Sequence, residues 1–153
     1  MLHYQIEFDD YRQHLMHVTV RFLANPTQVL SLPTWIPGSY LIREFSKHLE
    51  SVRAYDEAGR ILKIQKFEKN KWRLFNTDHE LITVEYDVYA YDLSVRGAYV
   101  DQTRLYVNPA CACLGLDGQE DKAIEVEIFL PDELKHFQLA TGLTAKSLVK
   151  GRY

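Results

Sequence analysis

The stretch Ile82-Thr-Val-Glu-Tyr-Asp-Val-Tyr-Ala90 places an apolar side chain at every second position. Successive side chains on a β-strand point to opposite faces, so this period predicts a strand with one buried face. The same period recurs in shorter stretches that are separated by turn-forming residues, at Tyr4–Phe8, Met16–Phe22, Leu30–Leu32, Ile61–Ile64, Trp72–Phe75 and Ile124–Leu130. Many short strands with turns between them predict an all-β fold, an antiparallel β-sandwich in which one face of each sheet is buried.

The composition is that of a folded domain and argues against several classes of protein. The chain has 153 residues, of which 46% are hydrophobic and 25% charged, and this length is enough to bury a core. Its formal charge of -3 argues against a nucleic-acid-binding protein, which carries a basic excess. The sequence shows neither the ~20-residue apolar run of a membrane helix nor a secretory signal, so we expect no membrane partner and a cytoplasmic location.

A second stretch, Leu32-Pro-Thr-Trp-Ile-Pro-Gly-Ser-Tyr-Leu-Ile-Arg43, restricts its backbone heavily. Each of its two prolines fixes its own φ angle. Pro37-Gly38 fits the centre of a type II turn, where the glycine supplies the positive φ. Ser39 is a candidate cap for one short helix that follows it. We therefore expect a rigid corner that is either an architectural element or the wall of a binding site.

The C-terminal part of the sequence predicts one more strand, at Phe137–Leu143, which runs into a turn. The residues that follow, Thr144–Tyr153, show little pattern and no stop signal. We therefore expect a single domain over residues 1–153 that is cut from a longer protein.

Histidines and cysteines are the first residues to consider for a metal site. His14 and His17 lie three positions apart in a strand pattern, so they face opposite ways. The stretch His79-Glu-Leu-Ile-Thr83 nearly spells the zinc-peptidase motif HExxH, but it lacks the second histidine and opens a strand instead of a helix. Cys111 and Cys113 have no further ligands nearby and are interpreted as two buried thiols. We expect neither a metal site nor a catalytic set in this chain.

Aromatic and polar side chains gather in the middle of the chain. The crowded tyrosines are Tyr86, Tyr89, Tyr91, Tyr99 and Tyr106. Aromatic residues on sheet faces usually serve core or cross-strand packing, and the alternative is a recognition surface for a sugar or a peptide. The segment Ser94–Pro109 predicts a strand–loop–strand unit, which is either ordered by an Arg–Asp pair or faces a substrate.

With these segments identified, the chain resembles the N-terminal domain of the glycyl aminopeptidase family of zinc metallopeptidases. The stretches that carry the resemblance follow the family's order over nearly the whole chain. They are Tyr4–Phe8 with His14 after it, Leu32–Phe45, Arg96–Asp101, Tyr106–Pro109 and Leu139–Leu143. The run Trp35-Ile-Pro-Gly-Ser-Tyr40 is the most specific of them.

The resemblance implies a longer parent protein with three parts. These are a β-sandwich similar to the N-terminal domain of aminopeptidase N, a thermolysin-like catalytic domain and a PDZ domain. The zinc ligands and the general-base glutamate belong to the catalytic domain, so zinc is a cofactor of the parent and not of this chain. The chain is then a non-catalytic domain that packs on the catalytic domain of the same polypeptide and helps to wall the cleft for a peptide substrate.

Asp101 is the first candidate for a substrate contact, because a carboxylate beside the cleft can pair with a free amino terminus. Tyr40, Arg43 and Tyr99 are its candidate neighbours in such a substrate-binding site. The alternative function is a free-standing β-sandwich that binds a carbohydrate or a peptide through exposed aromatic side chains.

Overall fold

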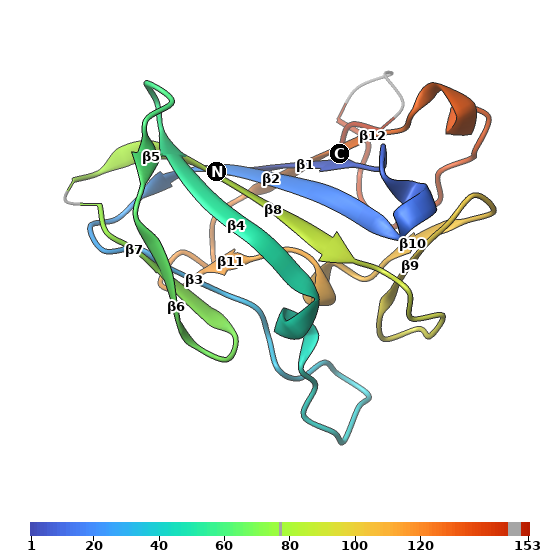
Figure 1. Ribbon diagram of the computed structural model, residues 1–153, viewed down its shortest axis with the longest axis horizontal. Helices are drawn as coiled ribbons and strands as arrows, with labels where there is room; N and C mark the ends of the chain where they lie inside the picture. The colour runs from blue at the N-terminus through green and yellow to red at the C-terminus, as the bar shows by residue number, and fades with distance from the viewer. Residues whose placement is uncertain (77, 147–150) are drawn as a thin grey trace.

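The computed structural model describes residues 1–76, 78–146 and 151–153. Its strands form a six-stranded sheet, a four-stranded sheet and a separate hairpin (Figure 1). The larger sheet has the order β12-β1-β2-β8-β4-β5, with bounds Ile124–Phe129, Leu2–Glu7, Leu15–Ala24, Glu80–Tyr89, Leu49–Asp56 and Ile61–Leu62. The smaller has the order β11-β3-β7-β6, with bounds Gly115–Leu116, Val29–Ser31, Lys71–Leu74 and Ile64–Glu68.

The remaining regular elements are short. Strands β9 (Ala98–Val100) and β10 (Leu105–Val107) pair as an antiparallel hairpin. The 3-10 helices are η1 (Tyr11–Gln13), η2 (Phe45–His48), η3 (Pro109–Cys111) and η4 (Asp132–Leu134). The all-β prediction is therefore confirmed.

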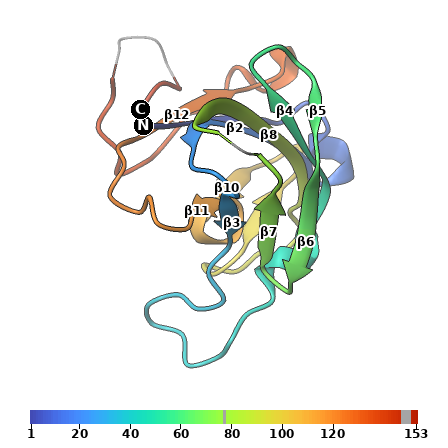
Figure 2. The same ribbon diagram turned by 90° about the vertical axis from the view of Figure 1, so that its left-hand side faces the viewer.

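The two main sheets stack as layers, and the larger sheet curves over the smaller (Figure 2). Strand β8 shows why the sequence folds this way, because its apolar period turns one face inward and leaves Ile82, Val84 and Tyr86 buried. The smaller sheet contributes Leu30 and Leu74, which are also fully buried in the same core cluster. Burial of both inner faces is what stabilises the sandwich.

The strand pairing departs from a purely antiparallel sandwich at one edge. Strand β2 pairs antiparallel with β8 along its whole length, from Leu15 opposite Tyr89 to Ala24 opposite Glu80. At the edge of the same sheet, β1 and β12 run parallel, with Leu2 opposite Ile124. Among the described strands, this is the one parallel pair in the sandwich.

Two local predictions change. The short helix expected after Ser39 begins only at Phe45, as η2, and residues 39–44 are irregular. The strand expected at Phe137–Leu143 is wrong, because these residues form no ladder. The edge of β12 pairs instead with the end of the chain. The Tyr153 N–H donates to the Val126 carbonyl at 2.8 Å, and the Val126 N–H donates to the Tyr153 carbonyl at 2.7 Å.

Candidate functional site

The chain between β3 and η2 forms a projecting loop, residues 33–44, which extends beyond the sandwich (Figures 1 and 2). The predicted turn lies at its centre: Gly38 has a φ of 81°, and the Ser39 N–H donates to the Ile36 carbonyl at 3.2 Å. The base of the loop is closed by a hydrogen bond of 2.7 Å from the Arg43 N–H to the Thr34 carbonyl. The loop is therefore tied at its base and at its turn.

The projecting loop buries one apolar side chain and exposes several others. Ile36 joins the core cluster and anchors the loop to the sandwich. The exposed large side chains of the loop are those of Trp35, Tyr40, Leu41 and Ile42. Apolar side chains grouped on one exposed segment are typical of a surface that another body covers.

Arg43 connects the loop to the body of the domain. Its side chain is half-buried, and its Nε has no hydrogen-bond partner within the described part of the chain. A guanidinium nitrogen that is buried without a partner costs free energy, so this side chain is held at the base of the loop by packing and not by a hydrogen bond at Nε.

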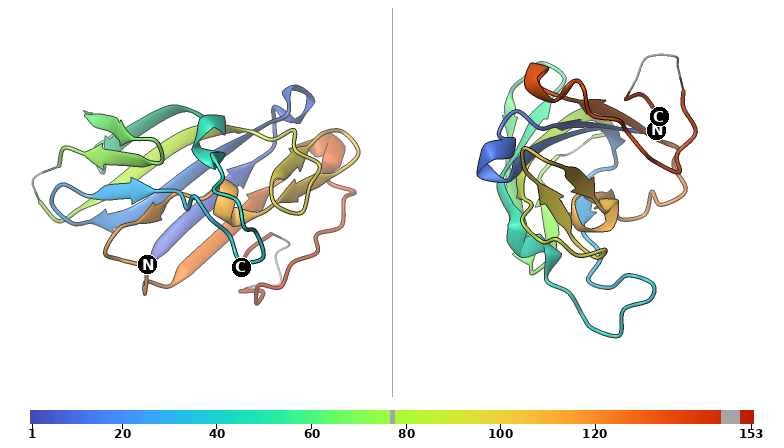
Figure 3. Two further views of the ribbon diagram at one scale, coloured as in Figure 1. Left: turned by 90° about the horizontal axis from the view of Figure 1, so that it is seen from below. Right: turned by 90° about the vertical axis from the view of Figure 1, so that its right-hand side faces the viewer.

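The second candidate segment is the β9–β10 hairpin, which lies beside η1 at the end of the sandwich away from β5 (Figure 3). Asp101 holds its turn. Oδ1 accepts hydrogen bonds from the Thr103 N–H at 2.6 Å, the Thr103 hydroxyl at 2.7 Å and the Arg104 N–H at 2.9 Å. Oδ2 accepts one from the Tyr99 hydroxyl at 2.8 Å. Both oxygens therefore have partners inside the hairpin.

These hydrogen bonds determine the protonation of Asp101. Burial acts to raise the pKa of its carboxyl, but the bonds from Thr103, Tyr99 and Arg104 outweigh it and hold the pKa well below its usual range. The pKa of the Tyr99 hydroxyl is raised, because donation to Asp101 favours its neutral form. The pair therefore keeps a carboxylate and a neutral phenol together at neutral pH.

The four predicted substrate-binding residues fall into two pairs. Tyr99 and Asp101 are in direct contact, whereas Tyr40 and Arg43 belong to the projecting loop. Within residues 1–76, 78–146 and 151–153, no hydrogen bond or ion pair joins one pair to the other. Their role in substrate binding stays a prediction.

Aromatic rings gather next to this hairpin in what we call the tyrosine–histidine cluster: His14, His48, Tyr89, Tyr91 and Tyr99. The His14 and Tyr91 ring centroids lie 4.1 Å apart, and Tyr91 stacks on Tyr99 at 5.4 Å. Tyr89 lies 6.3 Å from His48 and 6.5 Å from Tyr91. The sequence singled out the tyrosines. His14 was considered only as a metal ligand and in the resemblance, and His48 was not singled out.

The other tyrosine of β8 serves the core, as the packing interpretation predicted. Tyr86 is buried; its hydroxyl donates to the Ala112 carbonyl at 2.9 Å and accepts from the Leu114 N–H at 3.0 Å. Burial raises its pKa well above the usual range. Tyr86 therefore joins the larger sheet to the segment between η3 and β11.

An apolar cleft of about 970 Å³ lies between the inner side of β1 and β12 and the C-terminal segment. Its lining includes Phe8, Val126, Leu130 and Phe137. Among its described lining residues, Lys135 is the one with a charged side chain. The cleft therefore offers apolar volume without a set of groups for acid–base chemistry.

The residues considered for a metal site lie apart. His17 pairs with Asp87 at 3.0 Å on the outer face of the larger sheet, while the His14 ring lies in the tyrosine–histidine cluster. Glu80 begins strand β8, so the near-HExxH stretch does not lie on a helix. In the part of the chain that the structure describes, no group of three histidine, cysteine or acidic side chains is placed to hold a metal ion, and no helix is long and apolar enough to cross a membrane.

The two cysteines are free thiols. Cys111 ends η3 and is buried, and Cys113 is partly buried against the core. Burial raises the pKa of the Cys111 thiol to about 11 and that of Cys113 to about 12. Both are therefore protonated at neutral pH, which suits packing and not nucleophilic chemistry.

Comparisons with known proteins place this architecture. A search of curated proteins gave no match. Among solved structures, an aminopeptidase N family protein from Idiomarina loihiensis superimposes with a TM-score of 0.92 at 40% sequence identity. The alignment covers 99% of this chain and 26% of that protein. The family model of the Peptidase M61 N-terminal domain matches residues 3–153. The chain therefore belongs to the Peptidase M61 N-terminal domain family.

Proposed function

We propose that this chain is the non-catalytic N-terminal domain of a zinc-dependent aminopeptidase, where it packs on the catalytic domain and forms part of the wall of the substrate cleft. Family membership supports the peptidase assignment. The match to an aminopeptidase N family protein of much greater length supports a catalytic domain in the same polypeptide. These matches favour this proposal over the alternative that the chain is a free-standing carbohydrate- or peptide-binding module.

The finer features of the parent are part of the same proposal. The resemblance favours the glycyl aminopeptidase branch, with a PDZ domain, a cytoplasmic location and a peptide substrate. Zinc in the catalytic domain would lower the pKa of a bound water and polarise the peptide carbonyl. The residues of this chain would contribute by orienting the substrate and by excluding water from the cleft.

The projecting loop is the observation that carries the proposal. It is tied at its base and its turn, yet it holds Trp35, Tyr40 and Ile42 out from the sandwich. Exposure of an apolar side chain to water costs free energy, and this cost is removed when another surface covers the side chain. A catalytic domain that packs on this loop would bury those side chains and place Tyr40 and Arg43 at the junction of the two domains.

A charge placed on the projecting loop tests the proposal. Ile42→Asp in the full-length protein is expected to lower kcat/KM on peptide substrates by about tenfold or more, because a carboxylate enters a desolvated contact. In the 153-residue chain alone the same change should leave stability within about 0.5 kcal/mol, since Ile42 is 81% exposed there. Steady-state kinetics and thermal unfolding provide the two measurements.

Ile61→Asp is the matched control, because Ile61 is 80% exposed on β5, away from the loop. It should leave both kcat/KM and stability unchanged. Equal kinetics for Ile42→Asp and Ile61→Asp in the full-length protein would contradict a role for the loop in the domain junction.

Asp101 needs a test that separates substrate contact from support of the hairpin. Asp101→Ala in the full-length protein is expected to raise KM for substrates with a free amino terminus. Thr103→Ala removes hydroxyl support of the same turn and leaves the carboxylate in place, so it serves as the control. An unchanged kcat/KM for Asp101→Ala would remove Asp101 from the substrate site.

A further inference from the structure

A small pocket lies where the tyrosine–histidine cluster meets η2. Its volume is about 70 Å³, the size of a small functional group. The floor is apolar and is built by Phe45, Val88, Ala98 and Cys111 together with the backbone of Gly97. The other lining residues are His48, Tyr89, Tyr91 and Asp92. Aromatic rings beside one carboxylate are the groups that recognise an organic cation.

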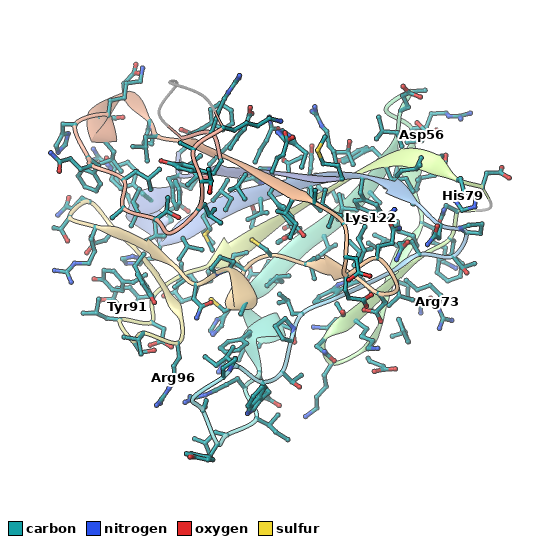
Figure 4. The ribbon with its side chains drawn as sticks, turned by 180° about the vertical axis from the view of Figure 1, so that it is seen from behind. Asp56, Arg73, His79, Tyr91, Arg96 and Lys122 are labelled. Atoms are coloured by element: carbon teal, nitrogen blue, oxygen red, sulfur yellow. The ribbon has the colours of Figure 1, made fainter. Side chains whose placement is uncertain are left out.

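Tyr91 is held in position before any ligand arrives. Its ring packs against His14 at 4.1 Å and stacks on Tyr99 at 5.4 Å, and the His14 and Tyr99 rings lie 6.4 Å from each other. His14 is itself fixed, since its Nδ1 lies 2.7 Å from the Val100 carbonyl oxygen. The Tyr99 hydroxyl is in turn tied to Asp101. The hairpin therefore fixes the orientation of Tyr91, whose exposed ring Figure 4 shows after the end of β8.

Gly97 fixes the position of Asp92. A Cβ atom at residue 97 would lie 2.6 Å from Asp92 Oδ2 and 2.8 Å from its Cβ, so the carboxylate packs against a position that only glycine permits. The Asp92 N–H also donates to the Ala98 carbonyl at 2.9 Å. Arg96, on the same loop, points away from the body of the molecule in Figure 4.

The local charge favours a cation. Besides burial, the ammonium of Lys47 and the carboxylates of Asp92 and Glu50 act on His48, so two acidic groups and one basic group lie near it. Burial lowers the pKa of the His48 imidazole, so the ring is neutral at pH 7 and does not repel a positive ligand. Asp92 also acts on Cys111 in the floor, which places its charge beside the pocket.

We propose that this pocket binds an ammonium group, with Tyr89, Tyr91 and His48 around the cation and Asp92 as its counter-ion. The ammonium group can come from a lysine side chain or from the amino terminus of a peptide. The proposal is independent of the peptidase assignment, because every group that it uses belongs to this chain.

Titrations of the 153-residue chain with three probes test the proposal. N-acetyl-lysine amide carries a side-chain ammonium, glycinamide carries an α-ammonium, and N-acetyl-norleucine amide is a neutral analogue of the first. We expect millimolar binding of at least one ammonium probe, seen as shifts of the Gly97 and Ala98 amide signals in NMR spectra. The norleucine probe should bind about fivefold more weakly or not at all.

The two ammonium probes distinguish the sources. Binding of the lysine derivative alone assigns a side chain, and binding of glycinamide alone assigns an amino terminus. Equal binding of the norleucine and lysine derivatives would overturn the proposal, because the site would then be a plain apolar pocket. Absence of saturable shifts with both ammonium probes would overturn it as well.

Variants assign the binding to the pocket. Asp92→Asn keeps the shape and removes the charge, so it should weaken binding about fivefold, whereas Asp9→Asn removes an exposed carboxylate elsewhere and should not. Tyr91→Leu should weaken binding to a similar degree. Gly97→Ala displaces the Asp92 side chain and should also weaken binding; if this variant unfolds, Asp92→Asn and Tyr91→Leu still decide. Unchanged affinity in both of these would overturn the proposal.

Discussion

Gly151 occupies a backbone position that other residues adopt only with strain. Its φ is 96°, and a Cβ atom there would lie 2.5 Å from the Ile128 carbonyl oxygen. Gly151→Ala is therefore expected to detach residues 151–153 from β12 and to cost on the order of 1–3 kcal/mol. Urea unfolding measures the cost, and hydrogen exchange at the Val126 and Ile128 amides, which bond to Tyr153 and Gly151, reports the detachment.

Gly142→Ala is the control for that substitution, because no atom lies within 4 Å of the added Cβ. It should leave both stability and exchange unchanged. Protected Val126 and Ile128 amides in Gly151→Ala would show that the chain end tolerates a side chain at this position.

The carboxylate of Asp101 makes stability depend on pH. Its folded-state pKa is depressed, so its contribution is complete above the ordinary value of 3.8 and declines as the pH falls below it. The urea midpoint of Asp101→Asn should therefore lie below that of the unaltered chain at pH 6, and the difference should narrow at pH 3. A difference of equal size at both pH values would contradict this assignment.

The sequence could single out Asp101 and its neighbour Tyr99, but not the bonds that Asp101 accepts from Thr103 and Arg104. A run of polar residues between two short strands points to a loop, and Asp101 and Thr103 lie close in sequence. The carboxylate's four hydrogen bonds depend on the backbone path of the turn, which the residue types alone do not determine. For the same reason the sequence could not predict that His48 belongs to the tyrosine–histidine cluster, because only the fold brings η2 next to Tyr89.

At the level of elements, the Tyr86 hydroxyl links β8 to the segment before β11. Tyr86→Phe leaves the Ala112 carbonyl and the Leu114 N–H without that partner in a buried site. We expect a loss on the order of 1–3 kcal/mol in the free energy of unfolding, measured with urea. Tyr4→Phe removes one bond to the Leu114 carbonyl and should cost less. A smaller loss for Tyr86→Phe than for Tyr4→Phe would contradict the linking role.

Strands with an unbroken period were predictable, whereas β4, which the sequence pattern did not predict, has a broken period. Strand β4 carries a register shift between Glu50 and Arg53, and Ser51 has a φ of 56°. A bulge of this kind moves later side chains to the other face of the sheet. The alternation of apolar and polar residues along the strand is therefore lost. Its last buried residue is the acidic Asp56, which further hides the pattern.

The projecting loop shows a similar limit for the helix. Pro37-Gly38 predicted the turn correctly, since the chemistry of that turn is local. The position at which η2 begins, Phe45, could not be predicted from neighbouring residues alone. It depends on the Arg43–Thr34 hydrogen bond, which closes the loop before the helix starts. Leu41 and Ile42, which lie before η2, are therefore exposed and are not part of a helix.

At the scale of the whole molecule, the two thiols report global unfolding. Their raised pKa values, about 11 for Cys111 and about 12 for Cys113, leave almost no thiolate at pH 8. Labelling with iodoacetamide should therefore be slow in the folded chain and should rise together with the urea unfolding transition. Rapid labelling of either cysteine without denaturant, followed by mass spectrometry, would contradict burial of the pair.

The parallel pairing of β1 with β12 has a consequence for synthesis of the protein. Leu2 lies opposite Ile124, so the edge of β1 that pairs with β12 stays unpaired until β12 is synthesised, on the order of ten seconds later. During that interval the edge carries unpaired amide and carbonyl groups and can pair with another nascent chain. Slow translation should therefore favour aggregation of this domain, and a holding chaperone that covers β1 should counteract it.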